Sequence, residues 1–298
     1  MSSTRPIFLL GIMQRCGTNF LNRLLLLHPD LESHPVSEDY LIAKSHNLFQ
    51  YVEQVSRHWN PSWDPDGAFR RSLIQHLGNS ILLFLQSNIH ENKRLIAKTP
   101  SVSNVSQVFN LFSHVDLVIL IRDGRDVVES GIRSFGWRFE GAIQKYARRT
   151  NEIQSFIQSN LNDDFRYLLV KYEELVLETE TTMRKILEFL RLDDSCYDFK
   201  AIQSIPVFGS STYKRKGAVD WKPVEKTSGF NPIRRWSRWS LYQKKRFYWI
   251  AGESIVFFNY MSRKECIDEL NFFWRIMNRC IDFIIRCRRI LSRIARRS

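Results

Sequence analysis

An apolar run that opens into a loop bounded by glycines is the feature that most constrains this chain. Residues 7–10 are Ile, Phe, Leu and Leu, the loop runs from Gly11 to Gly17, and leucines recur after it. The pattern predicts a strand over 7–12, a tight turn, and a helix over 18–27. Glycine lets the backbone approach a ligand closely, and free N–H groups at a helix start attract anions. The stretch therefore indicates an anion site.

The spacing of this loop differs from that of an ATP-binding phosphate loop. A Walker loop has four residues between its glycines and then Lys and Ser/Thr. Here five residues separate Gly11 from Gly17, Thr18 follows directly, and the cation, Arg15, precedes the second glycine. The loop suits phosphate or sulfate, but not the usual arrangement for a magnesium nucleoside triphosphate.

A second stretch has the composition of a buried parallel strand. Residues 117–121 are apolar throughout, and Arg122 follows at the expected carboxyl end. Asp123 is placed as a helix N-cap, and Ser130 lies about two helical turns further along. Ligands of open α/β sheets bind outside the carboxyl ends of strands. Arg122 and Ser130 are therefore candidate ligand-binding residues.

Together these segments resemble the sulfotransferases that use 3′-phosphoadenosine 5′-phosphosulfate (PAPS). Residues 15–19, Arg-Cys-Gly-Thr-Asn, match the Arg-Ser-Gly-Thr-Thr loop of that family with two conservative departures. Arg122 and Ser130 match its strand-end arginine and the serine eight residues later. Further matches follow in family order at residues 27–31, 98–100, 170–176, 189–190 and 235–236. The resemblance spans roughly residues 6 to 260 and favours the tyrosylprotein and carbohydrate-type branch, in a soluble, bacterial-like form.

The resemblance implies a fold, an activity and a set of cofactor-binding residues. The fold is α/β, a P-loop-NTPase-like three-layer arrangement with a central parallel sheet flanked by helices, plus a C-terminal helical extension. The activity is in-line transfer of a sulfuryl group from PAPS to a hydroxyl or amine acceptor, with no metal. The residues expected to bind PAPS are Arg15, Cys16, Gly17, Thr18, Asn19, Arg122, Ser130, Tyr172, Ser211, Lys222 and Arg235. The family also has an arginine soon after the serine, and Arg133 is one position off.

The catalytic roles are less narrowly defined. Arg15 and Lys98 are expected to stabilise the leaving phosphate, and Lys98 is held by the stiff turn at Pro100. For the base that takes the acceptor proton, the resemblance favours Glu38. His34 is a rival because its ordinary pKa suits neutral pH, and Asp39 is a third candidate.

Two other functions stay open at this point. The first is a nucleotide or small-molecule kinase with an atypical phosphate loop, against which the missing loop lysine argues. The second is a non-catalytic protein that binds membrane surfaces or polyanions. The acceptor itself, whether glycan, phenol, lipid or peptide tyrosine, cannot be read from these residues.

The rest of the chain divides into two parts. Residues 1–262 are expected to form the sulfotransferase domain, and 263–298 a basic amphipathic helical tail. Strands are predicted at 95–98, 117–121 and 166–171, and helices at 41–55, 69–88, 102–112, 125–135, 140–158, 179–190 and 241–258. Residues 203–235, rich in Ser, Lys and Pro, are expected to be one long loop.

Charge and cysteine content bear on partners and location. The net charge is +13, and the tail holds ten basic against four acidic residues among many aromatics and isoleucines. Such a helix can lie on an anionic membrane, or it can pack on the domain with a solvated basic edge. No recognised nucleic-acid fold accompanies the charge, so we expect no nucleic-acid partner. The five cysteines lack metal-ligand spacing, and the short N-terminus predicts a cytoplasmic protein without a signal peptide or transmembrane anchor.

Overall fold

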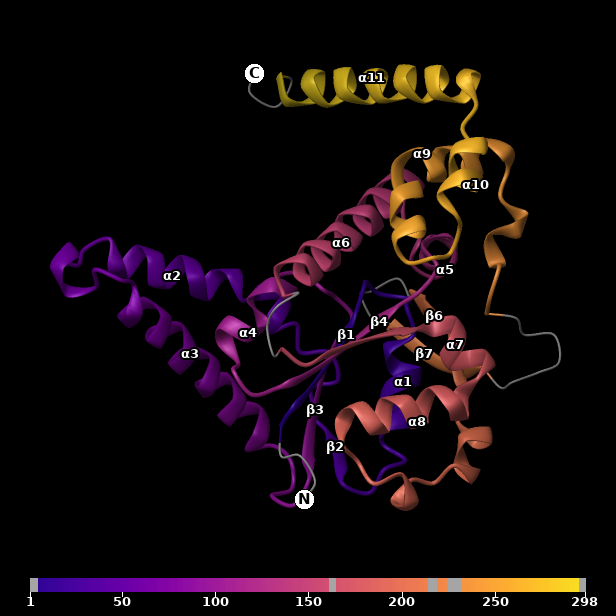
Figure 1. Cartoon of the computed structure of the whole chain (residues 1–298). Helices are drawn as coiled ribbons and strands as arrows, with labels where there is room; N and C mark the ends of the chain where they lie inside the picture. Colours follow the sequence, from indigo (N-terminus) through magenta and orange to yellow (C-terminus); the bar gives the residue numbers. More distant parts are fainter. Residues whose placement is uncertain (1–4, 161–164, 214–218, 225–231, 295–298) are drawn as a thin grey trace.

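The central element is a five-stranded sheet in which every neighbouring pair of strands is parallel. The computed structural model describes residues 5–160, 165–213, 219–224 and 232–294. The strand order is β2-β3-β1-β4-β5, with helices on both faces (Figure 1). The strands are β1 (Ile7–Gly11), β2 (Leu31–Ser33), β3 (Arg94–Thr99), β4 (Asp116–Ile121) and β5 (Tyr167–Lys171). The predicted P-loop-NTPase-like α/β fold is confirmed.

The two central strands explain why the sheet forms and where its ligands would lie. All residues of β1 and β4 are buried, as their near-continuous apolar runs require. In the register, Leu9 of β1 pairs with Lys98 of β3 on one side and with Val118 of β4 on the other. The carboxyl ends of three neighbouring strands are thereby aligned, so the loops that follow them meet at one edge.

Helices cover the sheet in two layers. The helices α1 (Thr18–Leu25) and α8 (Thr179–Leu190) lie on one side, and α3 (Ala68–Gln86), α4 (Val108–Leu111) and α6 (Phe139–Ser159) on the other (Figure 1). This division follows from right-handed crossovers, because only the connection from β1 to β2 runs in the opposite direction along the sheet. The other α-helices are α2 (His46–Ser56), α5 (Gly124–Phe135), α7 (Tyr172–Leu177), α9 (Leu241–Phe257), α10 (Arg263–Asp268) and α11 (Phe272–Ile294). Short 3-10 turns occur at Ile42–Lys44, Pro61–Trp63, Val105–Gln107, Asp194–Cys196, Lys200–Ser204 and Arg235–Arg238.

Three of the differences between the structure and the sequence predictions have a local physical reason. A three-residue edge strand, β2, stands where only a loop was expected, since so short a segment carries no apolar period. The helix predicted over 102–112 is shortened, because Asn104 adopts a left-handed backbone with φ 61°. Residues 203–235 are not one loop: β6 (Val207–Tyr213) and β7 (Val219–Val224) form an antiparallel hairpin within them. Polar residues interrupt both strands, Ser210, Ser211 and Thr212 in β6 and Asp220 and Lys222 in β7, so no apolar run revealed the hairpin.

The C-terminal helices stack on the end of α6, and α11 lies across that end of the molecule (Figure 1). None of the described helices is long and apolar enough to cross a membrane. The division of the chain at residue 262 stays a prediction.

Candidate functional site

The loop after β1 is shaped by two glycines that admit no larger residue. Gly17, with φ 104°, is the N-cap of α1, and a Cβ there would lie 2.4 Å from Cδ2 of Tyr172. A Cβ on Gly11 would lie 2.4 Å from Sγ of Cys16. Among the described residues, no side chain caps α1. The first N–H groups of an uncapped helix are the donors that anions use.

Arg15 and Ser130 connect this loop to the helix after β4. Arg15 Nε donates to Ser130 Oγ at 3.0 Å, and Arg122 Nη1 donates to the carbonyl of Arg15 at 2.8 Å. The Arg122 guanidinium also lies 4.3 Å from the ring centre of Tyr172 and donates to the carbonyl of Pro232. The structure thus brings together four residues that were predicted from separate motifs.

The cationic side chains of this cluster repel one another. Burial and the neighbouring charges of Arg122 and Arg235 lower the pKa of Arg15 to about 10. Burial, Arg122 and Arg133 lower the pKa of Arg235 as well. Arg15 is still protonated at neutral pH, so the cluster is a concentrated positive charge. A bound anion would relieve this repulsion.

The backbone near Arg235 is fixed by a buried carboxylate. Asp126, in the first turn of α5, accepts hydrogen bonds from the N–H groups of Arg234 at 2.8 Å and Arg235 at 2.6 Å. Burial raises the pKa of Asp126, although Arg122 opposes that shift. This carboxylate anchors the late segment beside Arg122, so a residue over a hundred positions away in sequence joins the cluster.

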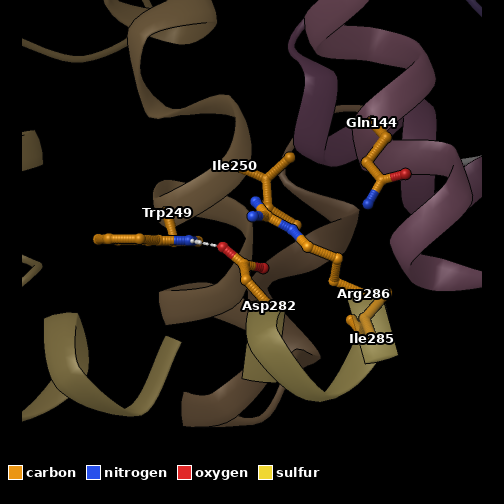
Figure 2. A pocket seen from close by; sticks show the side chains of 6 residues that line it. All are labelled: Gln144, Trp249, Ile250, Asp282, Ile285 and Arg286. Atoms are coloured by element: carbon orange, nitrogen blue, oxygen red, sulfur yellow. Dashed lines mark hydrogen bonds between the residues drawn. The ribbon is translucent and has the colours of Figure 1, made fainter. Parts of the chain in front are cut away.

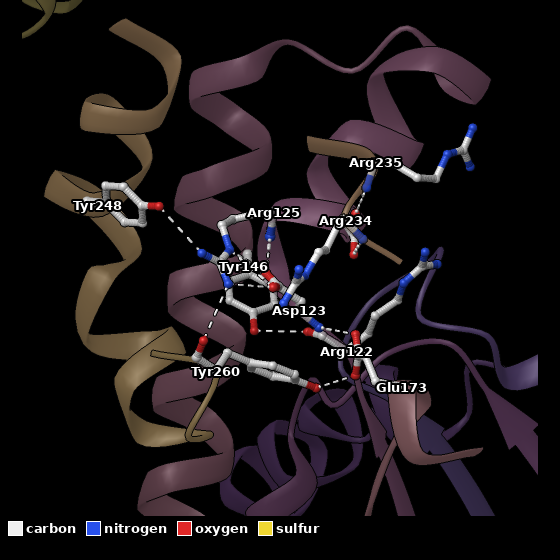
Figure 3. A network of polar contacts seen from close by, with 10 residues as sticks. Arg122, Asp123, Arg125, Tyr146, Glu173, Arg234, Arg235, Tyr248 and Tyr260 are labelled. Atoms are coloured by element: carbon white, nitrogen blue, oxygen red, sulfur yellow. Dashed lines mark hydrogen bonds and ion pairs between the residues drawn. The ribbon is translucent and has the colours of Figure 1, made fainter. Parts of the chain in front are cut away.

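Arg125 belongs to the framework behind the cluster. Its guanidinium pairs with Asp123 at 2.7 Å and donates to the hydroxyl of Tyr248 (Figure 3). It also lies over the ring of Trp236. Asp123 also caps α5 by accepting from the N–H of Arg125 at 2.9 Å. The network ties the end of β4 to α9.

A third strand end supplies a second group of polar side chains. Lys98 lies at the end of β3, and its Nζ donates to Oδ1 of Asn19. The same Nζ lies 4.0 Å from Oε1 of Glu38. Burial lowers the pKa of Lys98, while the Glu38 charge opposes that shift. Glu38 Oε2 accepts from the hydroxyl of Tyr40 at 3.1 Å. A carboxylate and an ammonium group are therefore held beside the start of α1.

The two rival bases have other partners. His34 is buried, its Nδ1 accepts from the N–H of Val36 at 3.1 Å, and its ring lies against Phe84. Asp39 Oδ1 accepts from the Thr99 hydroxyl and from the N–H of Leu41. Burial raises the pKa of Asp39. Both side chains shape the turn that presents Glu38.

Sequence reasoning missed the side chains that hold Glu38 in place. The Tyr40 hydroxyl accepts from Gln14 Nε2 at 3.2 Å, and Gln14 Oε1 accepts from Lys145 Nζ at 2.9 Å. No motif marks these residues, and Tyr40 adopts a left-handed φ of 54°. Gln14 lies inside the loop from Gly11 to Gly17, and that position was the one sequence signal that could have marked it as a site residue.

Two predicted residues cannot be placed by their side chains. Ser211 and Lys222 stand on the paired strands β6 and β7. Their side chains lie outside the described part of the structure. Within the described residues, no group of three or more His, Cys, Asp or Glu side chains could hold a metal ion.

Comparison with known proteins defines the family. The Sulfotransferase family matches residues 6–195, which is more than half of the chain. The chain belongs to this sulfotransferase family. Protein-tyrosine sulfotransferase A of Caenorhabditis elegans is 26% identical over 231 residues, covering 74% of this chain and 59% of that protein. The Drosophila melanogaster protein-tyrosine sulfotransferase is 25% identical, covering 62% and 38%.

Solved structures of similar proteins are more distant. The mouse sulfotransferase SULT7A1, complexed with PAP (3′-phosphoadenosine 5′-phosphate), is 14% identical with a TM-score of 0.46. The match covers 91% of this chain and 89% of that one. The sulfotransferase domain from the curacin biosynthetic pathway is 21% identical with a TM-score of 0.43, covering 63% and 74%. Among the protein-tyrosine sulfotransferases of known sequence that it matches, the chain spans between 38% and 59% of the relative's length.

Proposed function

We propose that this sulfotransferase moves a sulfuryl group from PAPS to a hydroxyl or amine acceptor by in-line transfer. The observation that carries the proposal is the cluster of Arg15, Ser130 and Arg122 at the adjacent ends of β1 and β4. Family membership supports the reaction class. The departure from the Walker pattern argues against the alternative of a kinase.

The residues present fit a ligand with phosphate groups at two ends. We assign residues 15–19 to the 5′-phosphosulfate, and Arg122 and Ser130 to the 3′-phosphate. Tyr172 lies under Arg122, and Arg235 adds a third cation, after Arg15 and Arg122, at the late segment. The buried Nε of Arg122 has no hydrogen-bond partner among the described residues. An unpaired buried donor is costly, so this one supports an anionic ligand nearby. Ser211 and Lys222 stay candidates for closing over it.

The catalytic assignment follows from the second group of side chains. PAPS supplies the sulfuryl group, and the protein supplies charge and a base. We assign to Arg15 and Lys98 the stabilisation of negative charge that develops on the leaving phosphate oxygen. We assign to Glu38 the role of the base that takes the proton of the acceptor, because its carboxylate is part-exposed and lies 4.0 Å from Lys98 Nζ. His34 stays the alternative base, with an Nε2 that has no described partner.

The proposal is tested by incubating the full chain with radiolabelled PAPS and acceptors of different classes. Transfer of label to a phenol, glycan, lipid headgroup or peptide tyrosine supports it and names the class. The curated relatives are protein-tyrosine sulfotransferases by name, so a tyrosine peptide is the first acceptor to try. Label transfer from γ-labelled ATP, with none from PAPS, would support the kinase instead. Binding of neither nucleotide would favour the non-catalytic alternative.

The location of the protein is part of the same proposal. We keep the prediction of a cytoplasmic protein without a nucleic-acid partner.

A further inference from the structure

Helix α11 presents an apolar stripe to solvent. Its members recur at spacings of one, three, four and seven residues, so they share one side of the helix. Phe272 is 79% exposed and Phe283 67% exposed. The stripe consists of Phe272, Phe273, Ile276, Phe283 and Ile284, all exposed, with Cys280 between them. Large apolar side chains gathered on one exposed face mark an interaction site.

The opposite side of α11 is fixed to the body of the protein. Arg246 of α9, only 1% exposed, donates to Asp282 Oδ1 at 2.6 Å and to Asn278 Oδ1 at 3.0 Å. Trp249 donates to Asp282 Oδ2 at 2.8 Å (Figure 2). Arg246 also pairs with Glu140 of α6 at 2.6 Å. Rolling α11 to bury its stripe would break all of these contacts.

A pocket beside Asp282 shows how the middle of α11 meets α6 and α9. It measures about 380 Å³ and is lined by Gln144, Trp249, Ile250, Asp282, Ile285 and Arg286 (Figure 2). The contact between α11 and the body is thus partly open at Arg286. The helix is attached by polar groups on one side and leaves its apolar stripe outside.

Basic residues lie beside the stripe. Arg275, Arg279 and Arg286 are exposed and fall on the flank next to Phe272 and Phe283 when successive residues are turned by 100°. Asp282 is the one acidic residue in the α11 sequence, and it is engaged by Arg246 and Trp249. The flank of the stripe therefore carries positive charge without a matching acid.

We propose that this stripe docks on the surface of an anionic lipid bilayer. Apolar side chains would enter the boundary between headgroups and acyl chains, while the flanking arginines meet lipid phosphates. A second copy of the chain fits less well, because pairing two stripes brings like-charged arginine rows together with no free acid on α11 to offset them. The proposal does not depend on the transfer reaction.

Flotation of the full-length protein with vesicles tests the proposal. We expect it to float with vesicles of phosphatidylcholine and phosphatidylglycerol, to float far less with phosphatidylcholine alone, and to be released by salt. The double variant Phe272→Ser/Phe283→Ser should bind about tenfold more weakly or worse, since it removes two exposed aromatic rings that membrane binding would bury. The matched control Phe69→Ser/Leu83→Ser changes two similarly exposed apolar residues of α3, and this variant should bind normally.

A charge pair separates the contribution of the arginines. Arg279→Gln/Arg286→Gln should weaken binding and reduce its salt dependence, whereas Lys185→Gln/Lys200→Gln, at exposed positions elsewhere, should not. Circular dichroism and thermal unfolding show whether each variant is folded. Failure of the wild type to bind anionic vesicles would overturn the proposal, as would unchanged binding by the folded phenylalanine variant. Sedimentation showing a dimer that this variant dissociates would assign the stripe to a second copy instead.

Discussion

Arg15 Nε donates a hydrogen bond of 3.0 Å to Ser130 Oγ, across a separation of 115 residues in the chain. This bond joins the loop after β1 to helix α5 after β4, and Arg122 reinforces it by donating to the Arg15 carbonyl. The two halves of the proposed phosphate site are thus positioned by the protein itself. Preorganised donors of this kind bind an anion without first having to be ordered.

Ser130→Ala should reduce the ability of the protein to distinguish PAP from AMP. In the wild type, PAP should raise the melting temperature far more than AMP does, because only PAP carries the 3′-phosphate. Loss of a hydrogen bond to a charged group costs about 1.5–3 kcal/mol, so the PAP affinity should fall by at least tenfold. Thermal shift with both ligands measures this. Equal shifts in the wild type would contradict the assignment of Arg122 and Ser130.

Gly17→Ala should reduce PAP affinity far more than Gly136→Ala does. Both glycines have positive φ, 104° and 63°, so each substitution pays about 1–2 kcal/mol for a left-handed backbone. Only at Gly17 does the new Cβ collide with the ring of Tyr172, whereas nothing lies within 4 Å at Gly136. We expect Gly17→Ala to lose PAP binding and Gly136→Ala to keep it. Similar PAP affinities for the two folded variants would show that the close approach to Tyr172 does not shape the loop.

The parts of this molecule that were predictable are those with a local signal. The buried strands β1 and β4 were predicted from their apolar runs, and α8 begins and ends at the residues predicted. Arg15 and Arg122 follow such strands, so their approach could be expected from the rule that parallel strands end at one edge. The strand order could not be predicted in this way, because it depends on which strand edges pair when the chain folds.

The unpredicted parts depend on contacts between distant segments. Arg235 reaches the cluster because Asp126 binds its backbone, and no spacing rule links those positions. Glu38 is held by Tyr40 and Gln14 through hydrogen bonds that need a left-handed residue in the turn. The exposure of the α11 stripe follows from the contacts of Arg246 in α9, and nothing in the sequence indicated that this arginine would be buried.

Cys16 should resist alkylation although it lies in the proposed cofactor loop. It is fully buried, and burial raises the pKa of its thiol to about 11. The reactive thiolate is therefore scarce at pH 8, and access is blocked as well. Exposed Cys196 and Cys280 should be modified by iodoacetamide at least about tenfold faster. Peptide mass spectrometry after timed labelling measures the rates, and rapid labelling of Cys16 in folded protein would contradict the buried placement.

Arg246→Met should destabilise the protein and loosen α11. The substitution keeps much of the side-chain volume but removes the pairs with Glu140 and Asp282, whose side chains are 31% and 43% exposed. Because those carboxylates can regain water, we expect a loss of about 1.5–3 kcal/mol rather than more. Arg263→Met, which breaks an exposed pair with Glu253, should cost less than about 1 kcal/mol. Urea unfolding compares the two, and equal losses would show that Arg246 does not anchor α11.

Glu38→Gln should lower turnover sharply while leaving PAP affinity nearly unchanged. The amide keeps the shape of the side chain and can still accept from Tyr40, but it cannot take the acceptor proton. General-base catalysis contributes about 10²–10⁴-fold, so turnover should fall in that range. Asp39→Asn is the matched control: its carboxylate accepts from Thr99 and Leu41, so we expect a changed melting temperature with turnover largely kept. Single-turnover rates with saturating PAPS, together with PAP titration, separate chemistry from binding. Full activity in Glu38→Gln combined with inactivity in folded His34→Gln would transfer the base role to His34.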